Sequence, residues 1–233
     1  MKPQFTKYAG AAIAAFTLIS ATPEAAAQRR PGPAPGGGST AQVQVPKLQG
    51  ELKELGKAGD RFTAWRVANI DGAEWFTKTQ EELREQYREV EKKIREAVAE
   101  DRLNEKTARQ YLVMLLQIGE GSKTGEDATE TAIANLDAEV QSATVDNAKA
   151  ETLTPRLNQL QWQISEILLY GSKTSALSKG KMASLTRKLL SNEEKEVSSK
   201  EDGEISEREL EKLEEDAMEI WADLVKELRG RND

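Results

Sequence analysis

The sequence predicts an all-α protein of antiparallel helical hairpins, with about six main helices forming a bundle or a short solenoid. Two observations predict this class. Of the seven prolines only Pro155 lies beyond residue 46, and the chain there is rich in Glu, Lys, Leu, Ala, Gln and Arg, which favour helices. No convincing run of alternating β-branched residues bounded by turns is present. The nearest, residues 62–70, we expect to be a short helix capped by Asp60.

The first 27 residues have the pattern of a secretory signal peptide. Lys2 and Lys7 supply positive charge, residues 8–21 are uncharged and mostly apolar, and residues 25–27 form an Ala-Ala-Ala cleavage site. The apolar stretch falls short of the roughly 20 residues that span a bilayer. We therefore expect a periplasmic or secreted protein with no transmembrane anchor after signal cleavage.

A Pro/Gly-rich segment, residues 28–46, follows the signal peptide. Such a composition cannot bury enough apolar surface to offset its ordering entropy, so we expect a disordered linker. The helical domain is then expected at 47–233.

Apolar residues at spacings of three and four predict the main helices at 73–99, 105–118, 126–146, 155–170, 178–199 and 206–229. Asp71 is a candidate N-cap, Thr154 followed by Pro155 is a helix start, and Ser206-x-x-Glu209 is a capping box. Short connections favour antiparallel neighbours. The predicted hairpin units lie near 74–118, 126–170 and 178–229.

An internal repeat of about 50 residues is also predicted. Gly-Ser-Lys-Thr occurs at 121–124 and again at 171–174, and Leu103 and Leu153 precede the two copies by the same distance. We expect Gly121 and Gly171 to close helices in the left-handed conformation.

Composition excludes several function classes. The chain has no Cys and no His, which rules out thiol nucleophiles, Ser-His-Asp triads and zinc sites with Cys or His ligands. With 33 basic and 40 acidic residues, its net charge of −7 argues against nucleic acid as a partner. Carboxylates are plentiful, but none is marked as a catalytic pair. We therefore do not expect the protein to be an enzyme. The enzymatic alternative is a carboxylate-dependent hydrolase.

Residues 198–209 resemble an EF-hand calcium loop at four positions, Asp202, Gly203, Ile205 and Glu209. Ser198 and Lys200 stand where such loops carry Asp or Asn. The resemblance implies a calcium-responsive module with candidate metal ligands Asp202, Glu204 and Glu209. The same residues are also explained by a turn followed by the capping box, in which case no cofactor is expected.

Leu153-Thr154-Pro155 resembles the start of the Leu-Thr-x-x-Gln motif of small periplasmic chaperones of the Spy type, although Leu157 stands at the Gln position. That resemblance implies a cradle of helices that binds unfolded clients, which is one alternative function.

Charge is distributed unevenly along the C-terminal half. Residues 148–190 hold 7 bases and 2 acids, whereas residues 191–233 hold 16 acids and 7 bases. These blocks either pack together or present a polar face to a partner. The leading functional hypothesis is an exported, non-catalytic helical scaffold that binds another protein or an envelope component; the sequence leaves its oligomeric state open.

Overall fold

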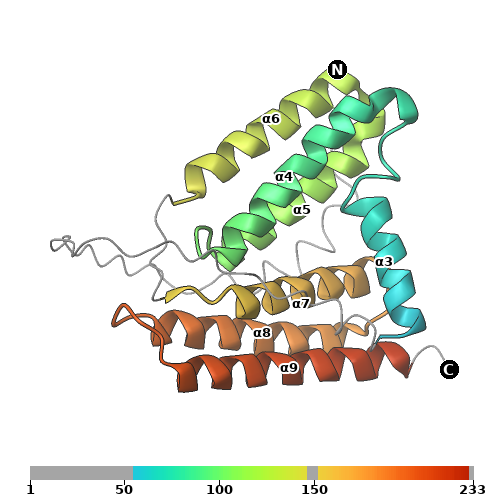
Figure 1. Cartoon of the computed structure of the whole chain (residues 1–233). Coiled ribbons are helices and arrows are strands. Elements are labelled where there is room, and N and C mark those ends of the chain that lie inside the picture. Colours follow the sequence, from blue (N-terminus) through green and yellow to red (C-terminus); the bar gives the residue numbers. More distant parts are fainter. Residues whose placement is uncertain (1–54, 146–151, 231–233) are drawn as a thin grey trace, which may run out of the picture. The chain divides into compact units, whose positions relative to one another are not determined.

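The computed structural model describes residues 55–145 and 152–230 (Figure 1). Over these residues the chain forms seven α-helices that pack against one another, and no strand. The all-α prediction is therefore confirmed. All the described residues belong to one compact unit. The predicted signal peptide and the linker at 28–46 lie outside the described residues.

Three helices form a first group, α4 (Glu81–Ala99), α5 (Glu105–Gly121) and α6 (Glu126–Ala143). Each packs on the other two, in the upper part of Figure 1. Their shared core consists of buried aliphatic side chains at helical spacing, among them Val90, Ile94, Leu112, Leu115, Ile133, Leu136 and Val140.

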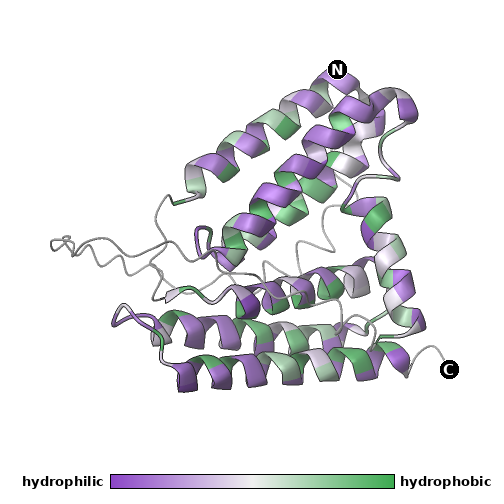
Figure 2. Cartoon of the chain, in the orientation of Figure 1, coloured by the Kyte–Doolittle hydropathy of each residue, from purple (hydrophilic) through white to green (hydrophobic). Residues whose placement is uncertain are grey.

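The second group consists of α7 (Pro155–Lys173), α8 (Lys179–Ser199) and α9 (Glu207–Arg229), which lie side by side in Figure 1. Helix α7 also packs on α4 and so joins the two groups. Their core holds Leu157, Leu160, Ile164, Ile167, Leu189, Leu213, Trp221 and Leu224. In Figure 2 both hydrophobic and hydrophilic residues alternate along α8 and α9, as in amphipathic helices that bury one face.

Helix α3 (Lys57–Asn69) packs on α7 through aromatic side chains. The Tyr170 ring lies 5.8 Å from the Phe62 ring and 5.6 Å from the Trp65 ring, centroid to centroid, both edge to face. This geometry is favourable for aromatic pairs. The N-terminal aromatic residues therefore contribute to packing between α3 and α7.

The helices of the expected middle hairpin join different groups. Helix α6 packs on α4 and α5, whereas α7 packs on α3, α4, α8 and α9. The reason is the distribution of apolar residues. Helix α6 buries a single stripe of four residues, but α7 buries residues around most of its circumference, including the continuous run from Ile164 to Gly171. A helix that is buried on most sides needs neighbours on those sides.

Several helix ends differ from the sequence expectations. Helix α3 begins at Lys57, before Asp60, and α4 begins at Glu81 instead of residue 73. Between them Gly72 adopts a positive φ of 73°, and a side chain there would meet the Phe76 ring at 3.0 Å. Asp71 caps no helix; its carboxylate binds Arg66. The capping box of Ser206 and Glu209 is confirmed.

The two Gly-Ser-Lys-Thr copies do not end their helices as expected. Gly121 has a φ of −82°, so it is not left-handed. Helix α7 continues through Gly171 to Lys173, and the left-handed residue that follows is Ser175, with φ 57°. At Gly171 the requirement is space, because an added Cβ would lie 2.4 Å from the Leu177 side chain.

Candidate functional site

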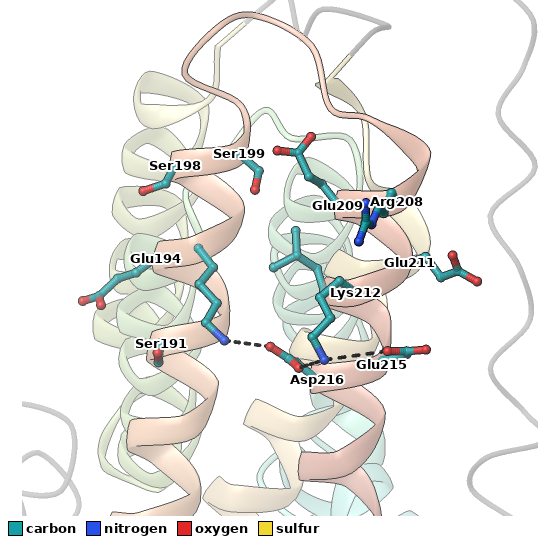
Figure 3. Close-up of a pocket in the computed structure, with 12 residues that line it drawn as sticks. Ser191, Glu194, Ser198, Ser199, Arg208, Glu209, Glu211, Lys212, Glu215 and Asp216 are labelled. Carbon is teal, nitrogen blue, oxygen red and sulfur yellow. Dashed lines mark hydrogen bonds and ion pairs between the residues drawn. The ribbon is translucent and has the colours of Figure 1, made fainter.

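A surface groove of about 820 Å³ runs between α8 and α9 near the turn that joins them (Figure 3). Most of its lining residues are charged. Five are acidic and three are basic: Glu194, Glu209, Glu211, Glu215, Asp216, Lys195, Arg208 and Lys212. The groove therefore has an excess of negative charge, supplied mainly by α9.

Asp216 lies between the two helices that form the groove, with interactions to either side (Figure 3). Its Oδ2 atom is 2.7 Å from Lys195 Nζ on α8, and its Oδ1 atom is 3.1 Å from Lys212 Nζ on α9. The hydrogen bond from Lys195, helped by that from Lys212, holds the pKa of Asp216 below its usual range. Asp216 therefore stays ionised at neutral pH.

The ion pair of Lys195 with Asp216 belongs to a series of ion pairs between α8 and α9. Lys188 lies one heptad before Lys195 on α8, and Lys181 lies two heptads before it. Lys181 Nζ lies 2.6 Å from Glu227, and Lys188 Nζ lies 2.6 Å from Asp223. The basic and acidic blocks of the sequence thus pair with each other in an antiparallel hairpin. Exposed pairs of this kind contribute little to stability.

The EF-hand-like segment 198–209 comprises the end of α8, the α8–α9 turn and the first residues of α9. Glu209 Oε2 accepts hydrogen bonds from the backbone N–H of Ser206 at 3.0 Å and from the Ser206 hydroxyl at 2.5 Å. These bonds lower the pKa of Glu209. Asp202 Oδ1 accepts from the backbone N–H of Glu204 at 3.3 Å. In this structure, Asp202 and Glu209 therefore both accept hydrogen bonds from backbone N–H groups of the segment.

Within the described part of the chain, Asp101, Glu105 and Glu196 form a group of carboxylates whose ligand atoms lie within 4.8 Å of one another. Lys200 already places its ammonium among them. Its Nζ atom is 2.8 Å from Asp101 Oδ1 and 2.5 Å from Glu196 Oε1. The ammonium group of Lys200, a residue of the EF-hand-like segment, thus lies where a cation would bind between the two carboxylates.

The Lys200 cluster, which we define as Asp101, Glu105, Thr154, Glu196 and Lys200, is completed by buried amides. Gln161 Nε2 on α7 donates to Glu196 Oε2 at 2.9 Å, and Asn158 Nδ2 donates to Asp101 Oδ1 at 2.9 Å. The Thr154 hydroxyl, expected to cap α7, is hydrogen-bonded to the Glu196 carboxylate instead. Burial, followed by repulsion from Glu196, raises the pKa of Glu105 to about 7. The cluster ties the α4–α5 turn, α7 and α8 together.

Next to this cluster, Arg109 on α5 forms a bidentate ion pair with Glu193 on α8. Both residues are buried, and the distance from Arg109 Nη2 to Glu193 Oε2 is 2.8 Å. Burial raises the pKa of Glu193, and the guanidinium of Arg109 offsets part of the rise. The fork geometry of arginine suits this contact between the two helix groups.

A second ionic cluster joins α3, α4 and α7 around Arg66, and we call it the Arg66 cluster. The guanidinium binds Asp71 at 2.8 Å, Glu91 at 3.0 Å and Glu166 at 3.2 Å. Glu91 and Glu166 have side chains only 7% and 4% exposed. Burial, followed by repulsion from Glu166, raises the pKa of Glu91 to about 7, and burial also raises the pKa of Glu166.

Sequence reasoning missed both buried clusters. A signal was present: Glu91 follows Val90 on the apolar stripe of α4, and Glu166 interrupts the apolar run of α7. A charged residue at a core position predicts a buried partner. The identity of that partner was not readable, because Arg66 lies 100 residues before Glu166.

Across the described residues, none of the helices combines the length and the apolar character needed to cross a bilayer. Comparison of the chain with protein-family models, with curated proteins and with solved structures finds no match. A functional assignment therefore depends on the chain's own residues.

Proposed function

We propose that this chain is an exported, non-catalytic helical scaffold that binds another protein or an envelope component. The observation that carries the proposal is the α8–α9 groove, about 820 Å³ in volume and lined by five acidic and three basic residues. A partner with a basic segment suits such a groove. Export is proposed from the signal-peptide pattern of residues 1–27.

The protonation states of the groove support recognition over acid–base catalysis. Asp216 and Glu209 have lowered pKa values, so they act as fixed negative charges near neutral pH. A general acid would need a pKa raised toward the working pH. Carboxylates with raised pKa values, such as Glu91 and Glu166, lie instead in the Arg66 cluster, held by a guanidinium.

The ion pairs within the groove can also be replaced by ion pairs with a partner. Lys212 and Glu215 are each 66% exposed at the side chain. Exposed pairs contribute little to stability, so a partner replaces them at small cost. Because the attraction is between exposed charges, association should weaken with rising salt.

The test is a pull-down with tagged residues 28–233 against envelope extract of the native host, comparing wild type with two charge-reversal variants. Glu211→Lys changes an exposed groove residue, and Glu130→Lys makes the same change on the exposed face of α6. Loss of a near-stoichiometric partner with Glu211→Lys alone supports the proposal. Equal capture by all three proteins contradicts a role for the groove, and capture of many unfolded clients favours the chaperone alternative.

A further inference from the structure

Two buried carboxylates from different helix groups share one guanidinium in the Arg66 cluster. Glu91 belongs to α4 and Glu166 to α7. Arg66 binds Glu91 through Nη2 at 3.0 Å and Glu166 through Nε at 3.2 Å. The two carboxylates therefore face each other across the contact between α4 and α7, one of the contacts that join the two groups.

The charges around this pair do not balance. Facing it are the Asp71 carboxylate after α3, the Arg66 guanidinium on α3 and the Arg95 guanidinium on α4. Three carboxylates thus meet two guanidiniums, and Arg95 Nε, 3.4 Å from Glu91 Oε1, makes no aligned hydrogen bond. A buried uncompensated charge is costly, and a carboxylate in that position takes up a proton.

The other polar groups at the pair are neutral donors. Trp162 on α7 donates its indole N–H to Glu166 Oε1 at 3.1 Å. Tyr87, one turn before Glu91, donates its hydroxyl to the carbonyl oxygen of Asn69 at 3.1 Å, and burial raises its pKa. Neither group supplies the missing positive charge.

We propose that Glu91 and Glu166 form a proton-dependent latch between the two helix groups. With one proton on the pair, α4 and α7 stay packed; when that proton leaves for solvent, the α4–α7 contact loosens. This device is independent of the partner proposed for the α8–α9 groove.

The direction follows from proton linkage. Separating α4 from α7 hydrates both carboxylates and removes each from the other, while Arg95 stays with Glu91 on the same helix. The open state therefore binds fewer protons and is favoured as pH rises. Because the pKa of Glu91 falls from about 7 in the packed state toward 4.5 once the carboxylate is hydrated, the contact loosens progressively between about pH 4.5 and about pH 7.

The test follows the full chain by NMR from about pH 4.5 to about pH 8. Below about pH 7, opening that releases one proton should increase up to about tenfold per pH unit, and above that pH it should level off. The indole N–H resonance of Trp162 reports Glu166 directly, and amide hydrogen exchange of α4 and α7, corrected for intrinsic rates, reports opening. We expect the Trp162 resonance to titrate and the exchange of both helices to accelerate with pH.

Matched variants separate the latch from general pH effects. Glu91→Gln removes the proton-binding group and should make the pH dependence of exchange in α4 and α7 shallower than in wild type. Glu89→Gln makes the same change at a side chain 54% exposed on the same helix, and should behave as wild type. A wild-type Trp162 resonance that does not move over this range, or pH-dependent exchange as steep in Glu91→Gln as in wild type, would overturn the proposal. If Glu91→Gln does not fold, the wild-type titration decides alone.

Discussion

Replacing Arg66 by Met tests whether the Arg66 cluster holds three helices together. The substitution keeps most of the side-chain stem and removes three contacts, at 2.8, 3.0 and 3.2 Å. Two of the partners, Glu91 and Glu166, then remain buried, with Arg95 at 3.4 Å from Glu91 and the Trp162 N–H at 3.1 Å from Glu166 as remaining contacts. Breaking a buried ion pair by removing one partner costs about 3–5 kcal/mol. That is a large share of the roughly 5–15 kcal/mol by which domains are stable.

Urea unfolding at neutral pH measures the loss. With a slope of about 2 kcal/mol per molar urea, a cost of 3–5 kcal/mol lowers the midpoint by roughly 1.5–2.5 M. The matched control is Arg88→Met on α4, whose guanidinium pairs with exposed Glu85 at 3.0 Å. We expect that control to lose less than about 1 kcal/mol.

Acid should reduce the penalty of Arg66→Met, because protonation of Glu91 and Glu166 removes the buried negative charge. Repeating the titrations near pH 5 tests this. A loss below about 1 kcal/mol at neutral pH would refute the reasoning, since a buried pair broken on one side cannot be that weak. A loss unchanged by acid would show that packing of the arginine stem, and not its charge, is responsible.

Three further results are expected. Unfolding free energy should decline as pH rises from about 4.5 to about 7. Burial, followed by repulsion from Glu166 and Glu196 respectively, raises the pKa values of Glu91 and Glu105 from 4.5 to about 7, so the folded state binds more protons than the unfolded state. Urea titrations at several pH values check this, and a free energy that increases across the window would contradict it. Gly171→Ala should destabilise the protein by about 1–3 kcal/mol because the added Cβ would lie 2.4 Å from the Leu177 side chain. Gly180→Ala, with open space around it, should be neutral or slightly stabilising. Thermal melts compare the two variants, and equal midpoints would contradict a steric clash at Gly171. Ser206→Ala should cost about 1 kcal/mol of stability through loss of the capping box. If capping is the only role of Glu209, the thermal melts of wild type and of Glu209→Gln should each be the same in calcium as in chelator. A calcium-dependent difference between the two proteins would instead support the EF-hand-like hypothesis.

Local rules predicted what depends on local geometry. The spacing of apolar residues located the helices, because a helix repeats every 3.6 residues and buries one stripe. Ser206 and Glu209 were recognised as a capping box since their contact spans a single turn. The start of α4 was misplaced by eight residues, because the turn at Gly72 depends on packing of Phe76 that no local rule contains.

The candidate groove was only partly predictable. The sequence showed opposite charge blocks, and the structure decided that they pair with each other along α8 and α9. Lys200 illustrates the limit further: its position in the chain placed it in the EF-hand-like loop, but its ammonium binds Asp101, 99 residues earlier. A lysine side chain is long enough to reach groups on neighbouring helices and turns, so its position in the sequence does not determine its partner.

The sequence by itself determined the all-α class, the approximate helices and the absence of Cys- and His-based chemistry, since each is a property of composition or of short-range spacing. Tertiary structure alone decided that α6 and α7 enter different groups, and that Arg66, Arg109 and Lys200 neutralise carboxylates far away in the chain. The physical reason is the cost of a buried charge: each buried carboxylate requires a partner, but any helix that reaches it in space can supply one.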